Sequence, residues 1–528
     1  MLALMLSIAI LSTILAACNN NSSNSSESSS PSQGTPDVLP SADTSNESMS
    51  DETLIVALMA EPTTITGLNS SATEASLVIA ECIGGTLLEY DNGNTKPSLA
   101  TGYETIDETH YRFTLRDGVC YSDGTPVTAQ DVVYSFACYA NSGVSSASYF
   151  NIEETVAEDD KHVVVAFNEY VPGWEFLVAE GSMPIYSEAG VEAVGGLEAT
   201  DRNAPVGCGR YKMSEWKSGE YILIERNENY WDKDYTGYYK YIKFIGISDA
   251  SSRLLAVQSG DANVAYKITA TDYIALESNP DVEGVITSNI DVYNLGFNCS
   301  SEKLSDPKIR EALTYAVDAE SVNALINMGR GKVAQGLFPE SFPYYHEVYE
   351  GGHLPFDPSK AKDLLAENGY PEGTLTLRLV CLAGNQNIAT IIQESMRQAG
   401  VTVDIIVEEQ SVYVQDARSG NYDLQIMTTS LGSVQPNCFN QVSPAQIGKS
   451  IGQCRITDPV MAEMCERAAS SNPATQEQGF SDIIDYVFEN YCLVGLCTQS
   501  KYCAVTSGIE GLTVGTRMSY IDVSYMHK

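Results

Sequence analysis

The chain has 528 residues, of which 43% are hydrophobic, and a formal net charge of −39 at pH 7. This length predicts roughly two to four domains with packed cores. The strong negative charge argues against binding to nucleic acid or to anionic lipid headgroups, because both would repel it. After Ala17 no apolar run is long enough to span a bilayer, which predicts a soluble mature chain.

The first 17 residues are almost wholly apolar and end in Leu15-Ala16-Ala17, directly before Cys18. A short apolar stretch that ends in small residues is typical of a secretory signal. A Cys after Leu-Ala-Ala resembles the bacterial lipobox, in which this Cys receives a lipid and becomes the new N-terminus. We therefore expect a signal peptide over 1–17 and lipid attachment at Cys18, although no Lys or Arg precedes the apolar run. The alternative is a transmembrane anchor, for which 17 residues are marginal.

Residues 18–52 are rich in Ser, Asn, Pro and Glu and contain few large apolar side chains. Such a segment cannot bury enough surface to offset its ordering entropy, so it is predicted to be a disordered, lipid-anchored tether. The globular part begins near Thr53, where the apolar run 54–58 predicts a buried strand.

Three helices are indicated by their start signals. Thr128 is an N-cap candidate for a helix over 129–139, with Asp131 placed as in a capping box. Asp306-Pro307 and Asp357-Pro358 each put a capping carboxylate before a first-turn Pro.

An alternation of strand and helix follows in the second half of the chain. Strand-like and helix-like segments at this spacing form a βαβ unit, which predicts an α/β region with a parallel sheet. Earlier in the chain, two alternating segments predict a smaller α+β region. The predicted segments are strands 374–382, 401–407 and 422–428 with helix 388–398, and the earlier strands 111–115 and 163–167.

The chain has 13 Cys, and without Cys18 an even number remains, which permits disulfides. Candidate pairs are Cys438 with Cys454, or two of Cys492, Cys497 and Cys503, and free thiols in an anaerobe are an equal alternative. No Cys-x-x-Cys occurs, and the His residues form no cluster with metal-ligand spacing, so neither a metal site nor a cofactor is predicted. The His residues are His110, His162, His346, His353 and His527.

Several ordered motifs resemble the family 5 extracellular solute-binding proteins, the dipeptide, oligopeptide and nickel receptors of ABC importers. The most distinctive is Tyr111 to Val119 followed by Ser122 to Val132, and Ala204 to Tyr211 resembles the family's Asn-Pro-Val-Gly-Thr-Gly-Pro-Tyr segment. Further blocks resemble the family in Asn227 to Trp231, Leu255 to Asp261, Asn294 to Asn298, Asp306 to Asp318 and Asp357 to Tyr370.

The resemblance implies a two-lobed periplasmic-binding-protein-like fold of the class II type, with a hinge of two crossing segments and ligand buried between the lobes. On this chain the first lobe would take 53–289, with an extra α+β domain over about 83–192. The second lobe would take 290–498, and 499–528 would return to the first lobe.

The family loop that usually clamps a peptide amine commonly reads Trp-x-x-Asp-Tyr-x-Asp-Pro, and here it reads Thr429 to Pro436. Thr429 stands at the Trp, Gly432 at the first Asp and Gln435 at the second. Because a buried ammonium needs a countercharge, the usual amine clamp is predicted to be missing. Ser430, Ser433, Gln435 and Asn437 are candidates for hydrogen bonds to a neutral polar ligand.

Glu61, beside Pro62 in the loop after the first strand, is the best substitute carboxylate. The alternative is that Glu61 merely faces solvent. The predicted ligand-binding residues are Glu61, Pro62, Thr429, Gly432, Ser433, Gln435 and Asn437.

The resemblance thus implies a substrate-binding lipoprotein of an ABC importer, most of all for oligopeptides, dipeptides or a related small polar solute. A signalling-peptide receptor or an oligosaccharide-binding member of the family is the alternative. An exported hydrolase is disfavoured, since the sequence has no Gly-x-Ser-x-Gly, no His-Glu-x-x-His and no phosphate-binding loop of the form Gly-x-x-x-x-Gly-Lys-Ser/Thr. Expected partners are the permease subunits and, through lipid on Cys18, the outer face of the cell membrane of a Gram-positive bacterium. A monomer that binds no nucleic acid is expected.

Overall fold

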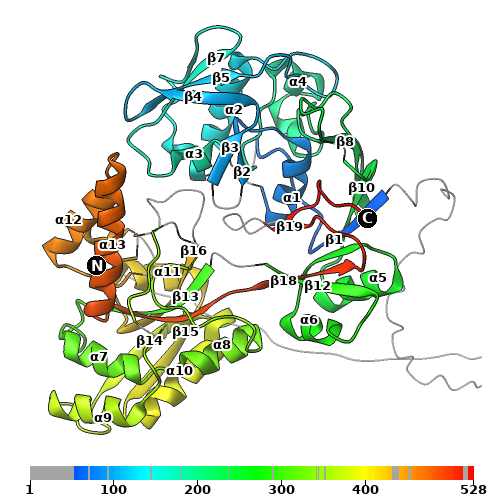
Figure 1. The fold of residues 1–528 in the computed structure, drawn as a ribbon. Coiled ribbons are helices and arrows are strands. Elements are labelled where there is room, and N and C mark those ends of the chain that lie inside the picture. Colours follow the sequence, from blue (N-terminus) through cyan, green and yellow to red (C-terminus); the bar gives the residue numbers. More distant parts are fainter. Residues whose placement is uncertain are drawn as a thin grey trace, which may run out of the picture. The chain divides into compact units, whose positions relative to one another are not determined.

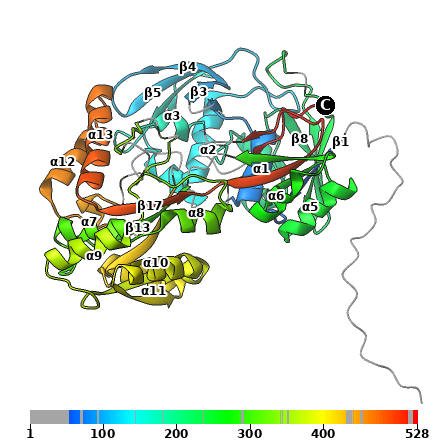
Figure 2. The same cartoon turned by 60° about the horizontal axis from the view of Figure 1, so that its bottom comes forward.

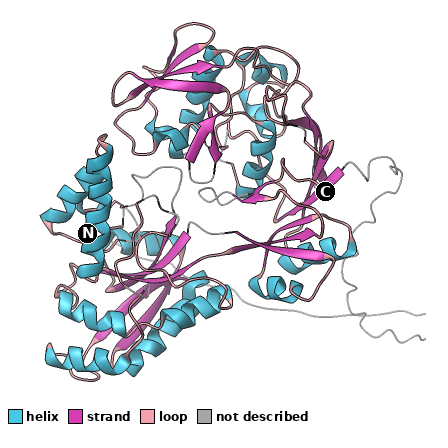
Figure 3. Cartoon of the chain, in the orientation of Figure 1, coloured by secondary structure: helices cyan, strands magenta, loops and turns pink. Residues whose placement is uncertain are grey.

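The computed structural model describes residues 53–68, 72–91, 94–142, 145–179, 181–235, 237–287, 291–340, 342, 344–349, 353–430, 439, 441–449, 453–514 and 521–528. Their strands form one seven-stranded, one five-stranded, one four-stranded and two two-stranded sheets, with helices packed against them (Figure 1; Figure 3). The predicted α/β class is confirmed. Of the described helices, none combines the length and the apolar character needed to cross a membrane.

The seven-stranded sheet contains the first predicted strand, β1 (Thr53–Leu58), which pairs in parallel with β10 and β11. Leu54, Val56 and Leu58 pack with α1 on one face of the sheet, and Ala57 packs with α5 on the other. Both faces are therefore covered, which is why the strand reads as a continuous apolar run. The order is β12-β18-β11-β1-β10-β9-β8.

The C-terminal segment of the chain also packs in this region, because Ile521, Val523 and Met526 belong to the same apolar cluster as residues of α1. The bounds are α1 Glu74–Ile83, β8 Tyr211–Lys217, β9 Tyr221–Arg226, β10 Tyr241–Gly246, α5 Ala250–Ser259, β11 Val264–Ile268, α6 Ala270–Leu276, β12 Val282–Thr287, β18 Lys501–Thr506, β19 Thr513–Val514 and β20 Ile521–Asp522.

The four-stranded antiparallel sheet has the order β4-β5-β7-β6 and its own apolar core. Its helix α2 begins where predicted, and the Asp131 carboxylate accepts hydrogen bonds from the backbone N–H and the hydroxyl of Thr128. The bounds are β2 Leu88–Asp91, β3 Asn94–Pro97, β4 Ala100–Thr105, β5 His110–Leu115, α2 Ala129–Ser142, β6 Val156–Ala157, β7 His162–Ala166, α3 Trp174–Leu177 and α4 Glu188–Ala193.

The five-stranded sheet has the order β15-β14-β16-β13-β17 and confirms the predicted βαβ unit, because β14 and β15 pair in parallel. β13 pairs antiparallel with β16 and β17, so the sheet is mixed. Asp306 and Asp357 cap α7 and α9 as predicted.

The helices of this region cover the sheet, and α12 and α13 pack together beside it. The bounds are β13 Asp291–Phe297, α7 Pro307–Tyr315, α8 Ala319–Asn327, α9 Pro358–Glu367, β14 Thr376–Leu382, α10 Gln386–Gln398, β15 Thr402–Glu408, α11 Gln410–Ser419, β16 Leu424–Ser430, α12 Pro459–Ala468, α13 Pro473–Glu489 and β17 Leu493–Thr498.

The chain crosses between the seven- and five-stranded sheets twice, from β12 to β13 and from β17 to β18. The second crossing is visible in Figure 2 as consecutive strands in red. Asn327 braces it, since its amide donates to the Thr498 carbonyl at 2.7 Å and accepts from the Ser500 N–H at 3.1 Å. The predicted boundaries 289/290 and 498/499 fall on these crossings, and the division into lobes at those residues stays a prediction.

Candidate functional site

Both segments that cross between the two sheets leave or enter each sheet at the same edge, which is formed by the ends of the strands. In the seven-stranded sheet, β1, β10 and β11 are parallel and β18 runs against them, so the carboxyl end of β1 and Lys501 at the start of β18 share an edge. In the five-stranded sheet, Asp291 at the start of β13 lies opposite Ser430 at the end of β16. Ligands of open α/β sheets bind outside the carboxyl ends of the strands.

The covalent connection keeps the two edges close. Thr498 ends β17 and Lys501 begins β18, and three peptide steps span at most about 11 Å. The predicted residue Glu61 follows the end of β1, and the predicted residue Thr429 lies at the end of β16. Both therefore belong to these edges. We take the two edges as the candidate site.

The Glu61 carboxylate accepts hydrogen bonds from three other residues of the chain. Its Oε1 accepts from Arg202 Nη1 at 3.0 Å and from Trp216 Nε1 at 2.7 Å, and its Oε2 accepts from the Gly219 N–H at 2.9 Å. Burial by itself raises the pKa of Glu61, but the hydrogen bonds from Trp216 and Gly219 outweigh it and the pKa lies below 4.5. Pro62 beside it is buried. The carboxylate is thus charged and neutralised by Arg202.

Glu74, the first residue of α1, is the centre of a second charged group. It accepts hydrogen bonds from the Tyr266 hydroxyl and from Lys267 Nζ, and from Lys501 Nζ at 3.1 Å. Burial raises the pKa of Glu74, but the hydrogen bonds from Lys267 and Tyr266 and the charge of Lys501 outweigh it, so the pKa lies below 4.5. Side-chain exposure is 25% for Glu74 and 10% for Lys501.

The first residue of β13 extends this charged group across the crossing. The charge of Asp291 favours the protonated form of Lys501, whose pKa burial lowers. Asp291 Oδ1 is buried and has no hydrogen-bond partner among the described residues. Lys267 has φ of 56°, a left-handed conformation that residues other than Gly rarely adopt, and such strain concentrates at functional sites.

The hydrogen-bonded group around Thr429 on the five-stranded sheet is neutral by contrast. The hydroxyl of Thr429, which is 3% exposed, accepts from Asn294 Nδ2 at 3.0 Å and donates to Gln441 Oε1 at 2.8 Å. Asn294 Oδ1 and both amide atoms of buried Gln425 have no partner among the described residues. These amides lie on one sheet face, because Gln425 pairs with Gly296 and Asn294 with Met427.

Gly432, Ser433, Gln435 and Asn437 lie outside the described residues, and so does Cys18. Their roles stay predictions.

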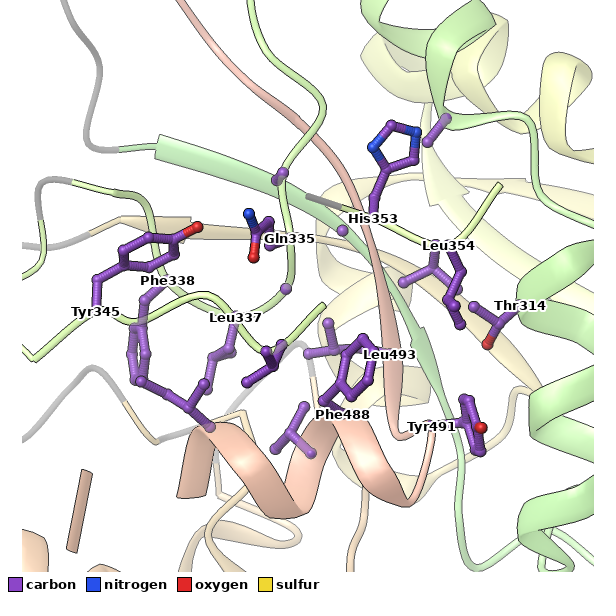
Figure 4. Close-up of a pocket in the computed structure, with 18 of the residues that line it drawn as sticks. Thr314, Gln335, Leu337, Phe338, Tyr345, His353, Leu354, Phe488, Tyr491 and Leu493 are labelled. Carbon is purple, nitrogen blue, oxygen red and sulfur yellow. The ribbon is translucent and has the colours of Figure 1, made fainter. Parts of the chain in front are cut away.

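A separate cavity of about 50 Å³ lies between α13, the start of β17 and the segments 334–338, 345–348 and 353–354 (Figure 4). It is the size of a few water molecules. Gln335 and Tyr345 contribute buried polar atoms that lack partners among the described residues, and the other labelled side chains are mainly apolar. The cavity adjoins the end of β17 that is remote from the crossing, so it is not part of the candidate site.

The histidines beside this cavity are paired with carboxylates. His346 Nε2 lies 2.8 Å from Asp485 Oδ1, and His353 Nε2 lies 3.6 Å from Glu320 Oε1. Within the described ranges, no group of three or more His, Cys, Asp or Glu side chains can hold a metal ion.

Sequence reasoning missed Glu74, Lys267, Lys501 and Asp291. These residues come from four separate elements, and no local motif links them. One signal was present: Thr73 and Ser76 form a capping box that marks the start of α1, and this start follows β1, where the site was expected.

Comparison with known proteins gives one matching family model. The model described as bacterial extracellular solute-binding proteins, family 5 middle, matches residues 94–443. The match covers more than half of the chain and includes the sequence blocks that predicted this resemblance.

Individual relatives extend the similarity over most of the chain. It is 26% identical over 486 residues to the oligopeptide-binding protein AppA of Bacillus subtilis, covering 87% of this chain and 88% of AppA. It is 27% identical over 401 residues to the heme-binding protein A of Haemophilus influenzae, covering 70% and 72%. The structure of HbpA2 from Haemophilus parasuis superposes with a TM-score of 0.81 at 20% identity, covering 90% and 99%. This last likeness shows the shared fold.

Proposed function

The chain belongs to the family 5 bacterial extracellular solute-binding proteins. We propose that it captures a small polar solute, with an oligopeptide as the preferred cargo, and delivers it to an ABC importer. The observation that carries the proposal is the family match over residues 94–443, together with two crossings that join the edges of two sheets. The nearly full-length similarity to an oligopeptide-binding protein supports a peptide as cargo.

The ligand would lie where the two edges meet and would be enclosed as the lobes close. The predicted contacts are those of Glu61, Pro62, Thr429, Gly432, Ser433, Gln435 and Asn437. Glu61 is neutralised by Arg202, and Glu74 is neutralised by Lys267 and Lys501. Asp291 has an oxygen without a hydrogen-bond partner among the described residues, but its charge already acts on Lys501. Because a buried ligand ammonium would need a carboxylate of its own, this favours a cargo that is neutral or acidic, or a peptide whose amine is not the main anchor.

The proposal places the mature protein outside the cytoplasm, attached to the membrane by a lipid on Cys18 through the tether 18–52. A Gram-positive cell surface and a monomer fit this arrangement. The lipobox-like Leu-Ala-Ala-Cys and the polar composition of the tether support the attachment. Mass spectrometry of the membrane-extracted protein would find a diacylglyceryl group at Cys18. An unmodified Cys18 in the mature protein would refute it.

Native mass spectrometry of gently purified protein tests the cargo. We expect a bound small molecule, and calorimetry with the identified compound should show binding without turnover. Simple dipeptides and their N-acetylated forms should bind with similar affinity. Tight binding of dipeptides that is lost on N-acetylation would overturn the argument about the amine, and hydrolysis of the bound compound would overturn the assignment as a binding protein.

A further inference from the structure

Three cysteines gather at the remote ends of β13 and β17. The Phe297 N–H donates to the Cys492 carbonyl at 3.1 Å, and the Cys299 N–H donates to the Cys454 carbonyl at 2.8 Å. The Cys299 thiol donates to the Phe297 carbonyl at 3.6 Å and the Cys492 thiol donates to the Asn490 carbonyl at 3.9 Å, and the two sulfur atoms lie close enough for Cys492 to donate to a Cys299 thiolate. Residues that are far apart in sequence thus place three thiols together, and the proposed solute binding uses none of them.

The three thiols differ in exposure. Cys299 is half-buried, whereas Cys454 and Cys492 are 0% and 1% exposed. Cys299 is therefore the most accessible of the three residues to a reagent from solvent. This order of access is that of an attacking thiol beside a resolving thiol.

The electrostatic environment also distinguishes Cys299. The hydrogen bond from Cys492 and the nearby Arg310 guanidinium lower the pKa of Cys299, although burial opposes them. The same hydrogen bond, with burial, raises the pKa of Cys492. By contrast, burial raises the pKa of Cys497 to about 12 and that of Cys503 to about 12. The thiolate is the reactive form.

Two other roles for the cluster have no support. All eleven cysteines in the described part of the chain are free thiols, so the pairings expected among Cys492, Cys497 and Cys503 are not formed, and Cys438 lies outside that part. The described residues also contain no group able to hold a metal. Cys454 and Cys492 also belong to an apolar core cluster, against which Cys299 packs.

The geometry points to Cys299 and Cys492 as a dithiol that small disulfide compounds oxidise to an intramolecular disulfide. The Cys299 thiolate attacks the disulfide reagent, forms a mixed disulfide and releases one thiol. Cys492 then loses its proton and attacks the Cys299 sulfur, which releases the second thiol. Two protein thiols become one disulfide, and one reagent disulfide becomes two thiols, so atoms and electrons balance.

Oxidised glutathione is a suitable probe for the full-length protein. After oxidation, free thiols are blocked with iodoacetamide, the protein is unfolded and digested, and the peptides are mapped by mass. We expect one cross-linked peptide pair joining Cys299 and Cys492, lighter by two hydrogen atoms than the two free peptides. In the reduced protein at pH 7, iodoacetamide should label Cys299 at least about tenfold faster than Cys492.

Matched variants separate this pair from the third thiol. Cys299→Ser and Cys492→Ala should both abolish the cross-link, whereas Cys454→Ala and the distant Cys497→Ala should retain it. A cross-link through Cys454 instead, or three thiols that stay alkylatable under conditions that oxidise a reference dithiol, would overturn the proposal. The peptide map of the unsubstituted protein decides the matter even if a variant fails to fold.

Discussion

The two edges of the candidate site are built from different chemistry. The edge of the seven-stranded sheet carries Glu61 and Glu74, both ionised and both paired with cations. The edge of the five-stranded sheet carries Thr429, Asn294 and Gln441, which are neutral and hydrogen-bonded to one another. Ion pairs respond to pH and neutral hydrogen bonds do not, so the two edges can be told apart in solution.

The difference also bears on the cargo. Glu61 and Glu74 each have a cation as direct partner, and the group around Thr429 offers hydroxyl and amide groups. A solute held between them gains hydrogen bonds more readily than a new ion pair, because a buried polar group that is left unpaired costs about 1 to 3 kcal/mol.

Glu74→Ala should have the largest effect. It leaves Lys267, Lys501 and Tyr266 without their common acceptor, and breaking a buried ion pair costs about 3 kcal/mol in the free energy of unfolding. Denaturant unfolding measures the change. The exposed Glu283→Ala on β12 is the control and should change it by less than about 0.5 kcal/mol. Equal losses in both variants would mean that Glu74 is a surface carboxylate like any other.

Thr429→Val should have the next largest effect, a loss of about 2 kcal/mol. The valine has the same shape but leaves Asn294 and Gln441 with unsatisfied buried groups. Thr428→Val is the control, because Thr428 precedes it on β16 with an exposed side chain. If the two valine variants are equally stable, the neutral network contributes nothing.

The sequence predicts the helices and strands better than it predicts this site. Asp306 and Asp357 mark α7 and α9 because a cap is a local signal. The βαβ unit around α10 follows from local periodicity in the same way. The sequence predicts Glu61 as a site residue, but it does not predict the partner of Glu61. Arg202 lies 141 positions away, and no sequence pattern indicates such a pair. The same holds for Glu74 and Lys501, which only the folded sheet brings together.

Low pH should weaken the charged edge alone. The pKa of Glu74 is lowered below 4.5 in the folded protein, so its contribution is complete above the unfolded pKa and is lost as the pH falls through the folded value. The difference in unfolding free energy between the unsubstituted protein and Glu74→Gln should therefore shrink as the pH falls from 7 through the folded pKa of Glu74. The difference measured for Thr429→Val should stay constant. A parallel change in both would remove the distinction between the edges.

Glu61→Gln should have the smallest effect on stability, about 0.5 kcal/mol, because Arg202 is 55% exposed and surface ion pairs contribute little. Exposed Glu198→Gln, in the 3₁₀ helix Leu197–Asp201 just before Arg202, is the matched control and should change nothing measurable. Ligand affinity is the more informative measurement. If Glu61 only fixes its loop, Glu61→Gln and Arg202→Met should weaken binding alike, since each breaks the same contact. If Glu61 instead binds a ligand ammonium, Glu61→Gln should weaken binding at least about tenfold while Arg202→Met strengthens it, because removing the competing cation frees the carboxylate.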